Sequence, residues 1–97
     1  MRHYLSQVVL QVGSDLVAVK AKVCALEVTE TGDWRVILQG LMPETLVLLQ
    51  DLFGTPHVVH VQGRLETDQR VRGDARVAKL SVGNLAVAVL EGTSNLA

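Results

Sequence analysis

The sequence predicts an all-β domain with one helix, in which five or six strands close into a small barrel. Valine (17 residues) and leucine (15 residues) supply most of the apolar content of this 97-residue chain, and β-branched residues favour strands. Apolar and polar residues alternate along most of the chain, which is typical of strands with one buried face. Only one segment spaces its apolar residues as a helix does.

A chain of this length can form one hydrophobic core but not two. No repeat, low-complexity tract or linker divides it. We therefore expect a single domain over residues 1–92 and a flexible C-terminal tail over residues 93–97.

The first half of the chain predicts three strands. The first covers residues 4–12 and ends at a Gly-Ser-Asp turn. The second covers residues 16–28, and its apolar set changes phase after Cys24, which predicts a β-bulge or a sharp bend there. The third covers residues 34–39 and ends at Gly40.

The fourth element is the predicted helix, about three turns long. Pro43 suits its first position because proline lacks the N–H that would be unsatisfied there. Glu44 favours the positive end of the helix dipole. Gly54 suits a left-handed C-terminal cap. The apolar stripe expected to be buried comprises Leu46, Leu49, Leu52 and Phe53.

The second half predicts two or three further strands. They cover residues 57–66, 74–82 and 85–90, with a polar loop over residues 67–73. Gly63, inside the first of them, is typical of a bend or a close approach of backbones.

This order of elements predicts the five- to six-stranded Greek-key barrel called the OB-fold, in which one helix after the third strand closes an end of the barrel. A ferredoxin-like domain would need a second helix, and an SH3-like barrel has no helix at this place. The phase change near Cys24 and the interior Gly63 supply the bends that closure needs.

Charge and cysteine content favour no particular partner. Nine basic and ten acidic residues give a net charge of −1, which provides no general attraction to a polyanion. Cys24 is the only cysteine, so no intrachain disulfide can form and a reducing compartment is expected. No signal peptide and no membrane-spanning run is evident. We expect a soluble cytoplasmic protein.

Two segments, DWRVILQG at residues 33–40 and VHVQGRLET at residues 59–67, resemble bacterial single-stranded DNA-binding proteins and the related primosomal replication protein B. Residues 33–40 (DWRVILQG), followed by Pro43 and Glu44, resemble the third strand and helix start of that family. Residues 59–67 (VHVQGRLET) resemble its next strand, Val-x-Val-x-Gly-x-Leu-x-Thr. The resemblance covers residues 33–90 and implies an OB-fold protein that binds single-stranded DNA in replication.

The sequence also departs from that family. One residue is missing between Trp34 and Arg35, and Gln39 replaces an aromatic residue. The loop after Thr67 lacks the family's tryptophan, and the loop between the second and third strands is much shorter. No acidic, glycine-rich tail follows, so recruitment of partners through such a tail is not expected.

Binding of single strands without sequence preference requires a basic groove and aromatic faces on which bases stack. Residues 64–79 hold five basic and three acidic residues, a local excess of positive charge. Trp34 is either a stacking platform or a core residue, and the arginine-rich segment is either a binding loop or a solvated hairpin tip. The candidate nucleic-acid-binding residues are Lys20, Lys22, Trp34, Arg35, Arg64, Arg70, Arg72, Arg76 and Lys79.

The sequence therefore predicts a non-enzymatic protein that binds single-stranded DNA or RNA weakly and with strong salt dependence. No catalytic motif is present, and we expect no cofactor and no metal. The alternative is an OB-like assembly subunit that no longer binds nucleic acid. Apolar residues 85–90 favour a homodimer or an added-strand interface, with a dimer the preferred oligomer, and a separate protein partner is also open.

Overall fold

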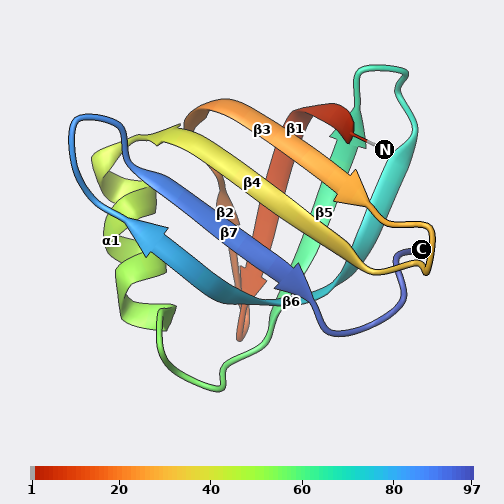
Figure 1. Ribbon diagram of the computed structural model, residues 1–97. Helices are drawn as coiled ribbons and strands as arrows, with labels where there is room; N and C mark the ends of the chain where they lie inside the picture. Colours follow the sequence, from red (N-terminus) through yellow and green to blue (C-terminus); the bar gives the residue numbers. More distant parts are fainter. Residues whose placement is uncertain (1) are drawn as a thin grey trace.

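Six antiparallel strands close into a barrel, and one further short strand extends it (Figure 1). The computed structural model describes residues 2–97; Met1, which belongs to the domain expected over residues 1–92, lies outside the described residues. The strands follow the order β2-β1-β3-β4-β7-β6-β5, and β5 pairs back on β1. The predicted fold class is confirmed as an all-β, OB-like barrel with one helix. The elements are β1 (Arg2–Val12), β2 (Asp15–Ala18), β3 (Ala21–Val28), β4 (Trp34–Leu41), α1 (Pro43–Leu52), β5 (Val59–Leu65), β6 (Arg70–Ser81) and β7 (Val87–Gly92).

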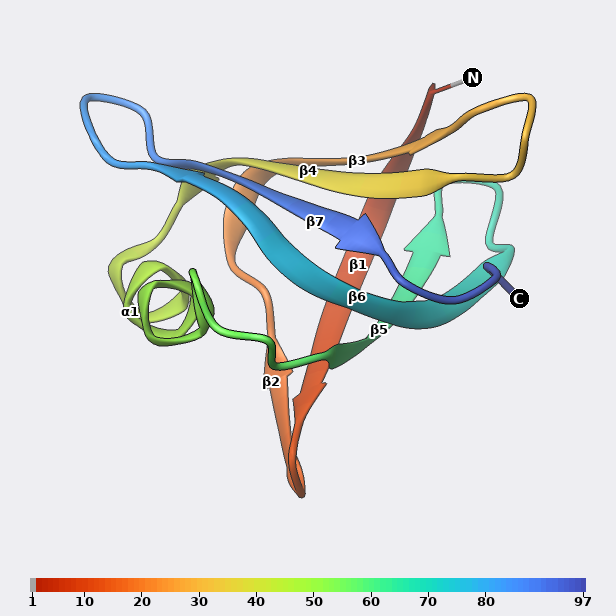
Figure 2. The same ribbon diagram turned by 60° about the horizontal axis from the view of Figure 1, so that its bottom comes forward.

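Helix α1 lies at one end of the barrel and is seen end-on in Figure 2. It begins at Pro43, as expected, and it buries Leu49 and Leu52 against the strands. Phe53 does not join the buried stripe: it caps the helix in an extended conformation and is 44% exposed. The expectation that the helix buries Phe53 is therefore wrong, because the helix ends one residue earlier.

The segment expected as one strand over residues 16–28 forms two strands, β2 and β3. The chain leaves the sheet at Lys20, whose backbone bonds to the start of the helix. Its N–H donates to Oγ1 of the buried Thr45 at 3.1 Å, and its carbonyl accepts from the N–H of Met42 at 2.9 Å. The bend therefore lies before Cys24, at the residue that the helix captures.

The turn that connects β5 and β6 is shorter than the loop expected over residues 67–73. Pairing of β5 with β6 already begins at Arg64 and Arg70. The turn between them is closed by the N–H of Leu65, which donates to the carbonyl of Gln69 at 2.8 Å. Asp68 supplies the left-handed residue of this turn, with φ of 73°. Arg70 and Arg72 consequently lie on a strand and not on a flexible loop.

Strand β7 lies between β4 and β6, so both of its edges are paired along the barrel. It begins at Val87, and Leu85 lies in the preceding loop. The expectation that residues 85–90 offer an edge for an added strand is therefore wrong.

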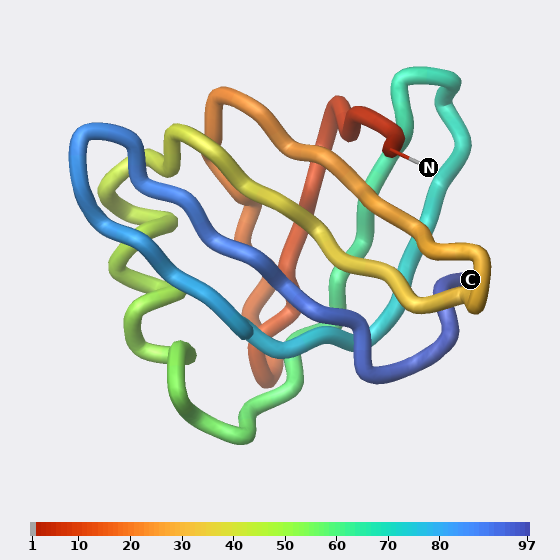
Figure 3. The backbone as a smooth tube through the Cα atoms, in the orientation of Figure 1, coloured from red at the N-terminus to blue at the C-terminus, as the bar shows by residue number. Residues whose placement is uncertain are grey.

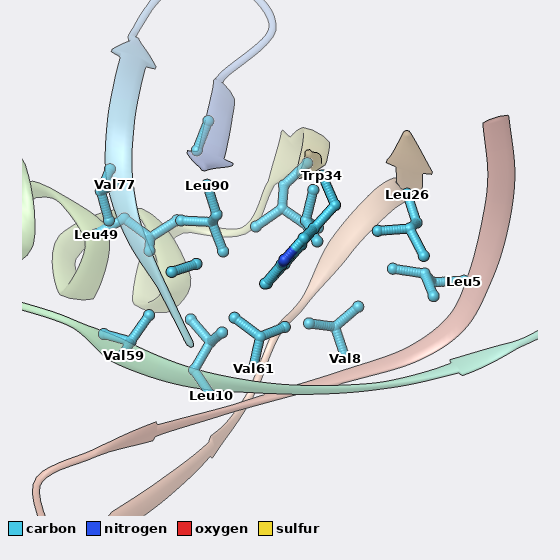
Figure 4. Close-up of a cluster of buried hydrophobic side chains, with 14 of the residues drawn as sticks. Leu5, Val8, Leu10, Leu26, Trp34, Leu49, Val59, Val61, Val77 and Leu90 are labelled. Atoms are coloured by element: carbon cyan, nitrogen blue, oxygen red, sulfur yellow. The ribbon is translucent and has the colours of Figure 1, made fainter. Parts of the chain in front are cut away.

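The core is aliphatic except for Trp34, whose indole lies between Leu90 and Leu26, away from the helix (Figure 4). Leu49 packs near Val77 at the helix end, while Trp34 lies nearer Leu26. The indole occupies the space that two glycines leave open. A Cβ on Gly73 would lie 2.6 Å from Cζ2 of Trp34, and a Cβ on Gly92 would overlap the ring.

The last residues of the chain, expected as a flexible tail over residues 93–97, run back against the barrel (Figure 3). The N–H of Thr93 donates to the carbonyl of Asp74 at 2.7 Å. Arg72 and Ala97 exchange two backbone hydrogen bonds of 3.0 and 2.8 Å, which places the tail along the edge of β6 that β7 leaves free. The carbonyl of Ser94 accepts the indole N–H of Trp34 at 2.7 Å. The segment therefore closes the barrel over Trp34.

Substitution Gly92→Ala is expected to destabilise the protein, because the added methyl group overlaps the Trp34 indole. Overpacking of this kind costs about 1–3 kcal/mol of unfolding free energy, measurable by urea denaturation. Gly83→Ala is the matched control, since nothing lies within 4 Å of its added Cβ. The control should change stability by less than about 1 kcal/mol. Equal stability of the two variants would contradict the packing described for Trp34.

Candidate nucleic-acid interface

The outer face of β6 carries a row of basic side chains. Arg70, Arg72 and Arg76 alternate with inward-facing residues and are exposed. An irregularity between Val77 and Lys79 shifts the register by one residue, so Lys79 also faces outward. The four basic residues that the sequence placed between positions 70 and 79 therefore share one face of one strand.

Arg64 joins the N-terminal half of this row from the neighbouring strand. It lies directly opposite Arg70 in the β5–β6 register, and Arg72 lies opposite Gln62. On its other side Arg64 faces Gln7 of β1. We call Arg64, Arg70 and Arg72 the arginine cluster.

The arginine cluster has two acidic neighbours, Asp68 in the turn and Asp74, which follows Arg72 on the outer face of β6 and contacts His60. Nη1 of Arg64 lies 3.7 Å from Oδ1 of Asp68, whose side chain is 86% exposed. Arg70 and Arg72 form no ion pair with any residue between positions 2 and 97. Two like charges directly opposite each other across a strand pair destabilise a sheet. A bound anion would therefore reduce the repulsion between the guanidinium groups of Arg64 and Arg70.

Three other predicted basic residues lie away from this cluster. Nζ of Lys20 lies 3.5 Å from Oε1 of Glu44 at the start of the helix. The stem of Lys22 packs over Gly40, on β3 and β4 and therefore away from β6. Nη2 of Arg35 lies 2.6 Å from Oε1 of Glu27 on the outer face of the β3–β4 pair. The structure thus brings together Arg64, Arg70, Arg72, Arg76 and Lys79, and separates Lys20, Lys22 and Arg35 from them.

Trp34 is a core residue in this structure and not an exposed stacking surface. Its side chain is 5% exposed, and residues 93–97 lie over its indole N–H. Of the two alternatives that the sequence leaves open, the structure supports the core role.

Phe53 is an exposed aromatic residue that the sequence reasoning assigned to the core. It lines a surface hollow together with Arg76, Lys79, Glu91 and the loop that follows the helix. An aromatic face beside two cations is the combination that single-stranded nucleic acids require. The signal available in the sequence was the position of Phe53 directly before Gly54, where a helix commonly ends.

A row of alternating charges crosses the outer face of five strands and ends at Arg76 of β6. In register across β1, β3, β4, β7 and β6 this charged row comprises Arg2, Glu27, Arg35, Glu91 and Arg76. Glu27 accepts hydrogen bonds from Arg2 at 2.7 Å and from Arg35 at 2.7 Å. These bonds, that of Arg2 foremost, lower the pKa of Glu27, and the bond to Glu27 raises the pKa of Arg2. Three arginines and two glutamates alternate in this row, whereas the arginine cluster contains no acidic residue.

The remaining reactive groups do not form a second site. Burial raises the pKa of the half-buried Cys24 thiol, which keeps it protonated at neutral pH. His60 Nδ1 lies 2.9 Å from Oδ1 of Asp74, its neighbour across the strand pair. Within residues 2–97, no group of three histidine, cysteine or acidic side chains is arranged to hold a metal ion.

No protein-family model, curated protein or solved structure gives a significant match to the chain. Among the described residues no helix has the length and apolar character needed to cross a membrane.

The acid dependence of stability should report the bonds of Glu27. Because the folded pKa of Glu27 is lowered, its stabilisation is present above the ordinary value of about 4.5 and is lost as the pH falls through the folded value. We expect Glu27→Gln to flatten the decline of the urea midpoint below about pH 4.5. Glu30→Gln, which removes an exposed carboxylate outside the charged row, should keep the wild-type decline. Identical acid dependence of wild type and Glu27→Gln would show that these bonds do not form in solution.

Proposed function

We propose that this protein binds single-stranded nucleic acid without catalysing a reaction, and that the arginine cluster on β5 and β6 contacts the phosphates. The observation that carries the proposal is the cross-strand pair Arg64–Arg70, with Arg72 beside it. The acidic side chains next to this group are Asp68, 3.7 Å from Arg64, and Asp74, which contacts His60. Phosphate oxygens would relieve the repulsion, and the planar guanidinium group suits their bidentate recognition.

The path of a strand over this surface follows β6. Arg70 and Arg72 lie at one end of the row, and Lys79 lies at the other beside Phe53. Nine residues of strand span about 30 Å, which is enough for several nucleotides. Phe53 is the stacking residue in this arrangement, in place of the buried Trp34. The short turn at residues 66–69 leaves the phosphate contacts on rigid strands.

The resemblance to single-stranded DNA-binding proteins and primosomal replication protein B supports the same proposal from the sequence. A divergent member of that family, acting in DNA replication in the cytoplasm, is the biological setting that we propose. Each stacked base contributes about 1–3 kcal/mol. Because the single tryptophan is buried, the proposed surface has one stacking residue, Phe53, and stacking contributes little in total. Binding should therefore be weak and dominated by phosphate contacts.

Salt dependence of binding to a labelled oligothymidine, measured by fluorescence anisotropy, tests this function. Three phosphate contacts predict a slope of about −2 for the logarithm of the binding constant against the logarithm of salt concentration. Replacing Arg70 and Arg72 by glutamine should reduce the slope by roughly 1.4, because each contact contributes about 0.7 on single strands.

The matched control replaces Lys20 and Lys22 by glutamine, which changes the net charge by the same amount away from the arginine cluster. This variant should keep the wild-type slope. Equal weakening by both double variants would show that net charge, and not the arginine cluster, determines binding, which would contradict the proposal. Undetectable binding of the wild type at low salt would also contradict it.

A second candidate function is that of an OB-like assembly subunit without nucleic-acid binding. It is favoured by one specific observation: the outer face of β3, β4 and β7 carries Val23, Ile37, Val87 and Val89 in place of polar residues. Binding of the oligonucleotide by the wild type distinguishes the two functions, because only the first requires it. The Arg70/Arg72 variant should weaken that binding and leave self-association unchanged.

A further inference from the structure

The outer face of β3, β4 and β7 carries the apolar residues Val23, Ile37, Val87 and Val89 where an antiparallel sheet usually meets water with polar side chains. The adjoining strand β6 contributes Lys79 and Ser81, and Ala25 of β3 is buried. Two registered rows make up this face. The first consists of Ala25, Ile37, Val89 and Lys79. The second consists of Val23, Gln39, Val87 and Ser81. Val23 is 37% exposed, and Ile37, Val87 and Val89 are partly exposed.

The charged row borders this apolar face and has a particular symmetry. Over the same four strands its members are Glu27, Arg35, Glu91 and Arg76. About the line between β4 and β7, each residue is matched by one of opposite charge: Arg35 by Glu91, and Glu27 by Arg76. In the first of the two other rows, Ile37 is matched by Val89 about the same line, and Ala25 by Lys79.

We infer that two copies of the chain associate through this face, about a twofold axis that runs parallel to the strands between β4 and β7. Such an axis places each row of one copy opposite the same row of the other copy, with the order of the strands reversed. Arg35 then faces Glu91 of the second copy, Glu27 faces Arg76, and Ile37 faces Val89. An axis along β4 itself would instead place Arg35 against Arg35, so the charges select one position of the axis.

The geometry of sheet packing permits these contacts. Two sheets that pack face to face keep their strand directions within about 30° of each other. Arg35 and Glu91 are next to the axis, where such a rotation displaces side chains least. The face covers on the order of 500 Å² per copy from strand and residue spacings, which is typical of a weak and reversible dimer.

This dimer does not depend on nucleic-acid binding. The arginine cluster lies around β5, with its neighbours on β1 and β6, and the proposed axis passes between β4 and β7. The two surfaces share Arg76 and Lys79 at the other end of β6, but they do not share the arginine cluster. Replacement of Arg70 and Arg72 by glutamine should therefore leave the dimer intact. Failure of either proposal can be recognised without reference to the other.

Sedimentation equilibrium over micromolar to millimolar protein tests the apolar contact. The wild type should dimerise reversibly, and Val89→Lys should raise the dissociation constant at least about tenfold, because it places a charge at the centre of the interface. Val47→Lys is the matched control on the exposed face of α1, where Val47 is 58% exposed, and it should dimerise as the wild type does. A wild type that remains monomeric, or a Val89→Lys variant that dimerises equally well, would overturn the inference.

Charge reversal tests the position of the axis. Arg35→Glu and Glu91→Arg should each be monomeric, since each variant places like charges across the interface. An equimolar mixture should form heterodimers, detectable by native mass spectrometry, because every central pair is then of opposite sign. Circular dichroism verifies that each variant is folded, and if either is not, the Val89→Lys comparison decides. Folded variants that form no heterodimer on mixing would contradict this axis.

Discussion

The contact between the Trp34 indole and the two glycines that face it, Gly73 on β6 and Gly92 on β7, determines how this barrel closes. The indole is the single large aromatic group in an aliphatic core, and it lies away from the helix. A side chain on either glycine would occupy the same space. The indole N–H also fixes the path of the chain after β7, because it donates to the carbonyl of Ser94. Packing around the indole thus holds three strands and the last residues of the chain together.

This use of Trp34 has consequences for the surface. A tryptophan committed to the core cannot stack a base, so the nucleic-acid binding that we propose depends on charge and on an exposed aromatic residue, Phe53. Charged side chains are distributed unevenly over the surface of the barrel. Around β5 and β6 the cations Arg64, Arg70 and Arg72 exceed their acidic neighbours, whereas across β3, β4 and β7 the charges alternate and compensate one another. The uncompensated region suits a polyanion, and the compensated region suits a second copy of the same surface.

Much of the fold could be predicted from the sequence because alternation and helix-end signals are local. Pro43 and Gly54 bracket the helix, and the inward positions of β4, β5 and β6 follow their period of two. The break before β3 could not be predicted, because it depends on hydrogen bonds between Lys20 and residues at the helix start, distant in the sequence. Phe53 was assigned wrongly because a shift of one residue in the helix end decides whether it is buried.

The candidate site was predictable in composition but not in arrangement. Spacing indicated a basic segment over residues 64–79, yet only strand pairing shows that Arg64 faces Arg70 and that Arg35 belongs to a compensated row. The symmetry of that row is likewise a property of the register between strands and cannot be read from the order of residues.

Fluorescence of Trp34, the only tryptophan of the chain, tests the central claim most directly. Its emission should be blue-shifted, resistant to quenching by iodide and unchanged when oligothymidine saturates the protein, because the indole lies inside the barrel. A red-shifted emission that iodide quenches freely, or quenching that follows oligothymidine binding, would place Trp34 at the surface and contradict this account.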